Sequence, residues 1–236
     1  MRYDPEGHLI FSPTDLIRYL ASPFASWMER CYLETPRTVT PDEDTEDARI
    51  IAQAGDDHER TVLDELKKAT PDLVVVPMGN FADAFKATRV AMGAKAPIIY
   101  QAAFKVAKFA GFADFLMLDE YGRYQVWDTK LAQSPKPYYA IQLCCYTEML
   151  SAVTGDSMAE KFGIILGGKD RVEFRVEDFI HYYGRIKSNF LLMQECFTGN
   201  IKDRPEPLPQ ADHGRWTSHA ETFFHETDHL VQVSGI

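Results

Sequence analysis

The chain has few cysteines and no long hydrophobic run, and each shortage excludes a class of protein. Only four of its 236 residues are cysteine, none of them in a C-x-x-C pair, and Cys144 and Cys145 are adjacent. The sequence therefore predicts neither a disulfide framework nor a paired-cysteine zinc site. No stretch approaches the roughly 20 apolar residues of a membrane helix, and the N-terminus lacks the basic and then apolar pattern of a secretion signal. We expect a cytoplasmic protein that does not associate with membranes.

Positive charge is also in short supply. Lysine and arginine total 25 against 35 acids, so the formal net charge is -10. This balance disfavours broad, nonspecific binding of nucleic acid, which is mainly electrostatic. Much of the negative charge lies in residues 41–47, however, and a binding channel needs only a local basic stripe. The candidate phosphate contacts are Lys105, Lys108, Lys136, Lys169 and Arg171. Taken alone, each of them also fits an ordinary surface lysine or arginine.

The hydrophobic content of 45% over 236 residues predicts one fairly large domain, residues 1–236, with a substantial core. Its most informative stretch is residues 110–130, which reads as two apolar strands joined by a turn at 119–122. Alternation of side chains along the second strand puts Asp128 and Lys130 on one face. Asp114 lies in the middle of the first strand, where a buried charge is costly without a partner or a metal.

A structural salt bridge is the alternative interpretation of Asp128 and Lys130, because exposed pairs are common and contribute little. Their position argues against it. The pair stands at the carboxyl end of an apolar strand, just before a polar loop at 132–137, and ligands in α/β sheets tend to lie at such ends. The residues indicate a divalent-ion site with a cationic assistant.

Two predicted helices add polar residues to this picture. Residues 47–69 have helical periodicity, with His58 on the apolar stripe; it is either a core histidine or a ligand. Glu59 projects about 100° away on the helix and is interpreted as a surface or outer acid. The helix at 138–152 carries Gln142 and Tyr146 on one face, where a core tyrosine beside a polar rim residue is the alternative.

Asp114 in a GxxD strand, Asp128-Thr129-Lys130 on the next strand, and Gln142 and Tyr146 in IQLCCY resemble the RecB-like branch of the PD-(D/E)XK nuclease superfamily. The resemblance covers nearly the whole chain. It implies an α/β fold with a central mixed β-sheet flanked by helices, a restriction-endonuclease-like core with helical N-terminal and C-terminal additions.

The resemblance also implies roles for individual residues. His58, Asp114, Asp128 and the backbone carbonyl of Thr129 would hold Mg²⁺ or Mn²⁺, which suits oxygen-rich ligation with one imidazole. Lys130 would assist the attacking water, and Gln142 and Tyr146 would position the substrate strand. The catalytic set implied is Asp114, Asp128, Lys130, Gln142 and Tyr146.

Relatives of this branch that carry an iron-sulfur cluster have one cysteine near the N-terminus and three near the C-terminus. Here the first position reads Ser22-Pro23, Cys31 lies too far along the chain, and the arginine-tryptophan pair at 215–216 has no flanking cysteine. We therefore expect no cluster, since its iron requires thiolates. The closing residues 228–236 resemble the end of a nuclease module that precedes a helicase or another nuclease domain, so a fused or associated helicase is an expected partner.

The sequence thus predicts a metal-dependent DNA nuclease in DNA repair, recombination or defence, an exonuclease or an enzyme directed to single strands or ends. The alternative is a catalytically silent nuclease-fold module that binds DNA or a partner protein. A remoter alternative is a metal hydrolase for another phosphoester.

Overall fold

The structure is a computed structural model, and it describes residues 1–230 of the chain. The expected α/β class is confirmed: helices flank a six-stranded mixed sheet in the order β3-β4-β5-β6-β7-β8. The strands of this sheet are β3 (Val74–Val75), β4 (Ile98–Val106), β5 (Phe109–Leu118), β6 (Tyr124–Lys130), β7 (Lys161–Leu166) and β8 (Arg171–Arg175). A two-stranded sheet is formed by β1 (Arg2–Tyr3) and β2 (Leu9–Ile10).

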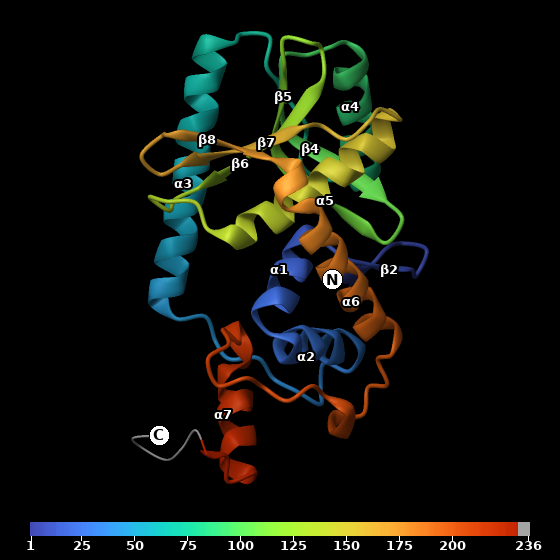
Figure 1. Cartoon of the computed structure of the whole chain (residues 1–236), viewed down its shortest axis with the longest axis vertical. Coiled ribbons are helices and arrows are strands. Elements are labelled where there is room, and N and C mark those ends of the chain that lie inside the picture. Colours follow the sequence, from blue (N-terminus) through green and yellow to red (C-terminus); the bar gives the residue numbers. More distant parts are fainter. Residues whose placement is uncertain (231–236) are drawn as a thin grey trace.

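The helical elements occupy both sides of the sheet and the opposite end of the molecule (Figure 1). The α-helices are α1 (Pro13–Ala21), α2 (Pro23–Glu34), α3 (Glu46–Ala69), α4 (Phe81–Gly93), α5 (Pro137–Thr154), α6 (Ile180–Glu195) and α7 (Thr217–Glu226). The short 3-10 helices are η1 (Val176–Asp178), η2 (Ile201–Asp203) and η3 (Gly214–Trp216). No helix within residues 1–230 has the length and apolarity needed to cross a membrane.

The strand pairing explains the order of the elements. The hairpin at 110–130 is confirmed as β5 and β6, which are antiparallel, while β6 and β7 are parallel. Parallel neighbours need a crossover, and α5 supplies it. The carboxyl end of β6 therefore leads directly through the loop at 131–136 into α5, and this connection brings α5 to the candidate site.

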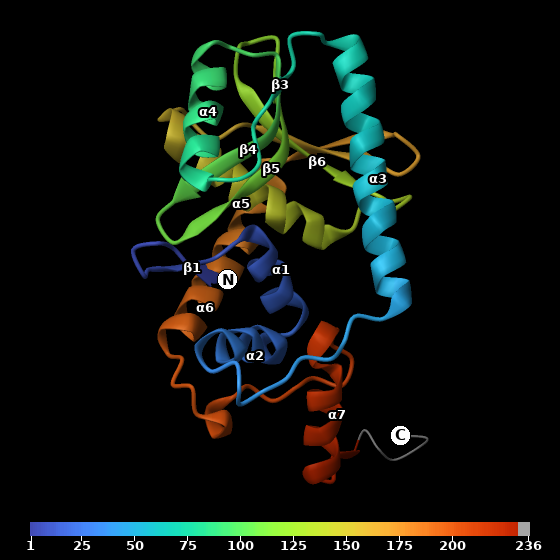
Figure 2. The ribbon, with the colours of Figure 1, turned by 180° about the vertical axis from the view of Figure 1, so that it is seen from behind.

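Alternate residues of the central strands feed two separate hydrophobic clusters. Val62, Leu63 and Leu66 of α3 pack with Phe115 and Trp127 on one face of the sheet. The other face packs against α5 and α4; its members there include Ile99, Leu116, Val126, Leu143 and Ala84. Because successive strand side chains point to opposite faces, α3 and α5 cover opposite sides of the sheet, as the two views show (Figures 1 and 2).

The helical half is built from α1, α2, α6 and α7, below the sheet in Figure 1; α1 contacts β5 and α5, and α6 contacts α5. Ser12-Pro13-Thr14-Asp15 is a sequence typical of a helix start, and α1 begins there. Asp15 accepts hydrogen bonds from the backbone N–H and the hydroxyl of Ser12, at 2.8 and 2.9 Å, and Pro13 occupies the first turn. The C-terminal segment also lies here. Of the closing residues 228–236 that the resemblance singles out, 231–236 lie outside the described residues.

The amphipathic pattern at 176–197 predicts one long helix, but the structure divides this segment. It forms η1, a break at Phe179, and only then α6. The ring of Phe179 packs against Phe162 and Phe174 with centroids 6.0 and 5.8 Å apart. This aromatic contact holds Phe179 against β7 and β8, so the regular helix α6 begins only at Ile180.

Candidate functional site

The candidate site lies where β5 and β6 separate. Their antiparallel pairing runs from Leu118 and Tyr124 to Phe115 and Trp127. Beyond that pair, the backbone N–H of Thr129 donates to Oδ2 of Asp114 at 2.8 Å, and the Thr129 hydroxyl donates to the same oxygen at 3.0 Å. The Asp114 side chain thus takes the place of a strand carbonyl, which fixes its carboxylate beside β6.

Asp128 and Lys130 lie next to this carboxylate, as the alternation of β6 predicts. Nζ of Lys130 is 2.5 Å from Oδ2 of Asp128. Asp128 is only 3% exposed, and its Oδ2 accepts no hydrogen bond of acceptable geometry, so the ion pair is the contact that compensates it. Lys130 also lies over the ring of Tyr139 at 5.5 Å, so this α5 residue borders the lysine. The sheet and α5 together enclose the pair.

The electrostatics of the three residues are unbalanced. Asp114 is partly exposed by surface area, yet protein atoms surround its carboxylate, and loss of hydration followed by repulsion from Asp128 raises its pKa well above 3.8. Burial opposes the charge of Lys130, but the carboxylates of Asp128 and Asp114 outweigh it and raise the pKa of the lysine. Two enclosed acids thus share one ammonium group.

Tyr146 reaches the site from α5 through a gap left by a glycine. A Cβ at Gly111 would lie 2.7 Å from the Tyr146 hydroxyl oxygen and 3.2 Å from Cδ of Pro13, so only glycine admits the phenol here. Burial, and then the negative charges of Asp114 and Asp128, raise the pKa of Tyr146 well above 10.0. The hydroxyl therefore stays protonated within the field of both acids.

Gln142 is half-buried on α5, one turn before Tyr146. Its amide has no hydrogen-bond partner among residues 1–230. Its place on α5, which follows directly from β6, agrees with the predicted position of a substrate-contacting residue, and its role stays a prediction.

His58 lies on α3 and is buried, as the apolar stripe predicts. Its Nε2 is 3.5 Å from the carbonyl oxygen of Ile165 on β7, which is the neighbour of Thr129 across the parallel ladder. Its ring does not join the two aspartates closely: among the described residues, His58, Asp114 and Asp128 form no group of donor atoms within 4.8 Å of one another. Its role as a ligand stays a prediction.

The acid that α3 directs towards the sheet is Glu59, which the sequence interpretation gave as a surface acid or one outside the direct ligands. Its Oε1 accepts hydrogen bonds from the hydroxyl of Tyr100 at 2.7 Å and from Nε2 of Gln101 at 2.5 Å. Burial and the charge of Asp114 raise the pKa of Glu59. One signal of this arrangement was present in the sequence: Gln101 is a polar amide within the apolar run PIIYQAAF.

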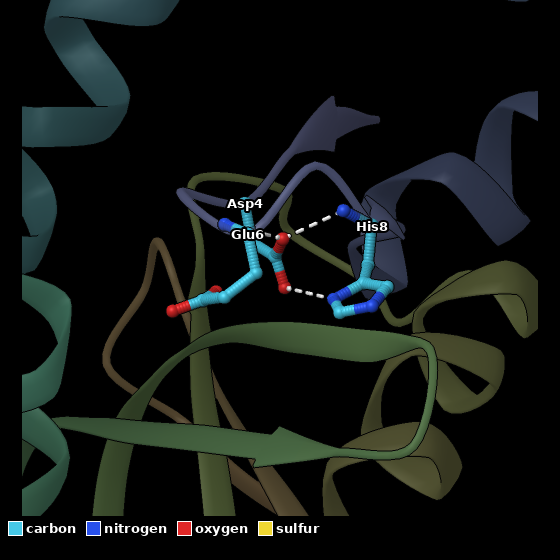
Figure 3. Close-up of side chains that lie close together, drawn as sticks. All are labelled: Asp4, Glu6 and His8. Carbon is cyan, nitrogen blue, oxygen red and sulfur yellow. Dashed lines mark hydrogen bonds and ion pairs between the residues drawn. The ribbon is translucent and has the colours of Figure 1, made fainter.

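A second group of possible metal donors lies at the N-terminus. Asp4, Glu6 and His8 are the three residues within 1–230 whose donor atoms all lie within 4.8 Å (Figure 3). Asp4 already accepts backbone N–H groups of Glu6 and His8, at 3.1 and 2.7 Å, and pairs with Lys105 at 3.1 Å. These bonds account for the group as a turn in which Asp4 is satisfied, and exposed acids of this kind are common without an ion.

The candidate phosphate contacts divide into two sets. Lys105, Lys108 and Lys169 pair with the acids Asp4, Glu195 and Glu65. Lys136 and Arg171 instead lie over the rings of Tyr138 and Trp127, each 5.9 Å from the ring centroid, as in cation–π contacts. Lys136 immediately precedes α5, so a cation and an aromatic ring adjoin the Lys130 region.

The donor set fits a hard divalent cation. Asp114 and Asp128 supply oxygen ligands, and the Thr129 backbone offers its carbonyl oxygen between Asp128 and Lys130 in the chain. Oδ2 of Asp128 is a buried acceptor without a hydrogen bond. Mg²⁺ and Mn²⁺ prefer oxygen ligands of this kind. A divalent charge would also offset the excess of carboxylates over ammonium groups.

Comparisons with known proteins add little to this description. No protein-family model matches the chain, and no curated protein matches it. The chain is similar to the crystal structure of a protein named SSO0001, with 16% sequence identity over 78% of this chain and 76% of that chain and a TM-score of 0.40. This likeness carries no argument about function, so the functional interpretation depends on the residues of the site.

Proposed function

We propose that the protein is a metal-dependent DNA nuclease, a phosphodiester hydrolase that uses Mg²⁺ or Mn²⁺ and acts on single strands or DNA ends. The observation that carries the proposal is the convergence of Asp114, Asp128 and Lys130 where β5 and β6 separate. Two enclosed acids beside a lysine are poorly compensated as a structural salt bridge. They suit a site that meets a cation and a phosphate.

Each residue has a physical task in this reaction. Asp114 and Asp128 would hold the cation, which supplies Lewis-acid polarisation of the phosphate and of a water. The Lys130 ammonium group, kept charged by Asp128 and Asp114, would stabilise negative charge that develops on the phosphate oxygens. Tyr146, protonated within the same field, would donate a hydrogen bond to the substrate, and Gln142 would orient the strand.

The surroundings of Lys130 support single strands or ends as the substrate. Tyr139 lies beneath the lysine, the ring of Tyr138 is 4.6 Å from that of Tyr139, and Lys136 lies over Tyr138. Tyr138 is 38% exposed. Exposed aromatic rings beside cations stack unpaired bases, whereas bases within an intact duplex are already stacked on one another.

The direct test is degradation of end-labelled single-stranded and duplex DNA in Mn²⁺ or Mg²⁺. We expect the wild type to degrade the single strand, and Asp128→Ala and Lys130→Ala to reduce the rate to background. Lys161→Ala is the matched control, because Lys161 also pairs with an acid, Glu173 at 2.8 Å, but both side chains are exposed; we expect its rate to equal that of the wild type. Full activity in both site variants would refute the proposal, and DNA binding without cleavage by the wild type would favour a silent binding module.

A further inference from the structure

A groove lies beside the candidate site, where α1 packs against both α5 and α6 (Figure 1). It is lined by Tyr138 at the start of α5, by Tyr182 of α6, by apolar side chains of α1 and by Asp212. We call it the tyrosine groove. Its volume is about 490 Å³, which falls within the roughly 300 to 1,000 Å³ of sites that bind organic ligands.

The sequence of α1 gives the tyrosine groove its apolar wall. Leu16 is fully buried in the main core, whereas Ile17 and Leu20 are only partly buried against that core. These two residues are three positions apart and therefore share one side of the helix, and both line the groove. A ligand with a flat apolar face that covered this wall would remove apolar surface from water, which is favourable.

Two exposed tyrosines border the groove, and each has a cation over its ring. Tyr138 is 38% exposed and Tyr182 is 43% exposed. Lys136 lies 5.9 Å from the ring centroid of Tyr138, and Arg185 lies 5.5 Å from that of Tyr182. Within residues 1–230 neither cation forms an ion pair with an acid. Both charges are therefore available to an anionic ligand that stacks on the rings.

The charge of the groove favours nucleic acid over an apolar peptide. Its acid, Asp212, accepts the backbone N–H of Gly214 at 2.9 Å and is held in a turn of its own segment. Lys136 and Arg185 thus give this place a local excess of positive charge on a chain whose formal net charge is -10. Aromatic rings that alternate with cations are the surface that binds unpaired bases and their phosphates, whereas an apolar peptide would not require a cation over each ring.

A series of contacts joins the tyrosine groove to the candidate site. Lys130, which pairs with Asp128, lies 5.5 Å from the ring centroid of Tyr139. That ring is 4.6 Å from the ring of Tyr138, at an interplanar angle of 73°. Consecutive helical residues project about 100° apart, so Tyr139 borders the lysine while Tyr138 borders the groove. A strand that meets Lys130 would therefore continue directly into the groove.

We infer that the tyrosine groove binds single-stranded DNA next to the candidate site, with unpaired bases stacked on Tyr138 and Tyr182 and phosphates paired with Lys136 and Arg185. The inference rests on the proposed function, because it names the surface along which the strand to be cut would lie. Bases within an intact duplex are not free to stack on these rings, so the groove selects single strands and frayed ends.

The test is fluorescence anisotropy of the full chain with a labelled oligothymidylate strand, in a chelator so that binding is read apart from cleavage. We expect Tyr182→Ala to weaken binding by about 5- to 150-fold, the loss for one stacked base, and Tyr182→Phe, which keeps the ring, to bind as the wild type does. Tyr121→Ala is the matched control, because Tyr121 is exposed and has Arg123 over its ring at 5.6 Å but does not line the groove. Wild-type affinity in Tyr182→Ala would overturn the inference.

An abasic strand of the same length separates stacking from charge, because it keeps the phosphates and lacks the bases. The wild type should bind oligothymidylate more tightly than the abasic strand, and Tyr182→Ala should reduce this difference. Arg185→Ala should instead weaken the binding of both strands and lower the slope of log affinity against log salt by about 0.7, the value for one phosphate of a single strand. Equal affinity of the wild type for the two strands would show that no base stacks in the groove.

The outcomes separate the inference from the proposed function. Urea unfolding first verifies that each variant folds, and cleavage in Mn²⁺ is measured separately from binding. If the wild type cleaves DNA while Tyr182→Ala binds the strand normally, the nuclease stands and the groove inference is wrong. If the binding differences are as expected but no DNA is cleaved, the groove inference is supported and the nuclease activity is wrong.

Discussion

The two halves of the molecule each bury an acid and treat it in opposite ways. In the helical half, Glu29 of α2 is 8% exposed and accepts hydrogen bonds from Nε and Nη2 of Arg215 at 2.8 and 2.6 Å and from Nε1 of Trp216 at 3.0 Å. In the sheet half, Asp128 is 3% exposed and has the ion pair with Lys130, but its Oδ2 accepts no hydrogen bond. One acid is fully compensated and the other is not.

The pKa directions follow from this difference. Burial alone would raise the pKa of Glu29, but the bonds from Arg215 and the charge of Arg18 outweigh it and lower the pKa. Beside Asp128, burial and like charge together raise the pKa of Asp114. Glu29 therefore joins α2 to a segment 186 residues later in the chain, whereas the sheet acids keep an electrostatic cost that a cation would relieve. Such costs are concentrated at functional sites.

Breaking the compensated acid should have the largest effect on stability. Glu29→Ala leaves Arg215 and Trp216 without their acceptor. Loss of one member of a buried ion pair should lower the free energy of unfolding by about 3 kcal/mol. This is the lower end of the usual range, because the Arg215 side chain is 41% exposed. Asp128→Asn removes the partner of Lys130 but also removes the charge that repels Asp114, which then remains as a carboxylate beside the lysine, so we expect a smaller loss than in Glu29→Ala. Urea unfolding at neutral pH with a chelator measures both. A larger loss in Asp128→Asn than in Glu29→Ala would reverse the comparison.

Packing at the site should give a smaller effect. Gly111→Ala brings a Cβ within 2.7 Å of the Tyr146 hydroxyl oxygen, and overpacking of a core contact costs about 2 kcal/mol. In a Tyr146→Phe background the nearest clashing atom is gone, so the same substitution should cost less, and urea unfolding of the double-mutant cycle measures the coupling.

The matched control is Gly184→Ala in α6, where a Cβ would meet no atom within 4 Å. It should gain about 0.5–1 kcal/mol, because alanine is the better helix former. If both alanine variants change stability equally, the close approach of Tyr146 to Gly111 is unimportant for the fold.

The sequence predicted those parts of the structure that local patterns control. Alternation along 124–130 placed Asp128 and Lys130 together, and the Ser12-Pro13 signal gave the start of α1. The contacts of Glu59 were not predictable in this way. Helical periodicity locates a buried stripe but not which of two neighbouring residues faces a particular strand. The backbone of Gln101, whose φ of +55° lies in the left-handed region, depends on tertiary contacts.

The contact between Glu29 and Arg215 was beyond sequence reasoning for a different reason. The two residues lie 186 positions apart, and each is of a type that is common at protein surfaces. The arginine-tryptophan pair was noticed only through its resemblance to cluster-bearing relatives. In the structure its side chains bind the Glu29 carboxylate, and Oγ of Ser22 lies 2.8 Å from Nδ1 of His213 in the same region, so hydrogen bonds join the N-terminal and C-terminal segments.

The pH dependence of stability should have opposite signs for Glu29 and Asp114. This is the smallest of the expected effects, about 1.4 kcal/mol for each unit by which the folded and unfolded pKa values differ. Glu29 has a lowered pKa in the folded state, so its contribution is present above its ordinary value of 4.5 and is lost as the pH falls. The advantage of the wild type over Glu29→Gln should therefore shrink as the pH falls below that value. Asp114 has a raised pKa, so its contribution is full below 3.8 and is lost as the pH rises through the folded pKa.

Asp114→Asn should accordingly gain stability relative to the wild type as the pH rises, the reverse of the trend for Glu29→Gln. Urea unfolding of the three proteins across the acid range, with a chelator present, measures both slopes. The same experiment with saturating Mn²⁺ sharpens the comparison, because a cation bound by Asp114 favours the ionised form of this carboxylate. The cation should abolish the pH dependence of stability that Asp114 causes and leave that of Glu29 unchanged. Parallel slopes for the two acids would mean that the sheet half compensates its carboxylates as fully as the helical half does, and the electrostatic argument for a cation site would lose its basis.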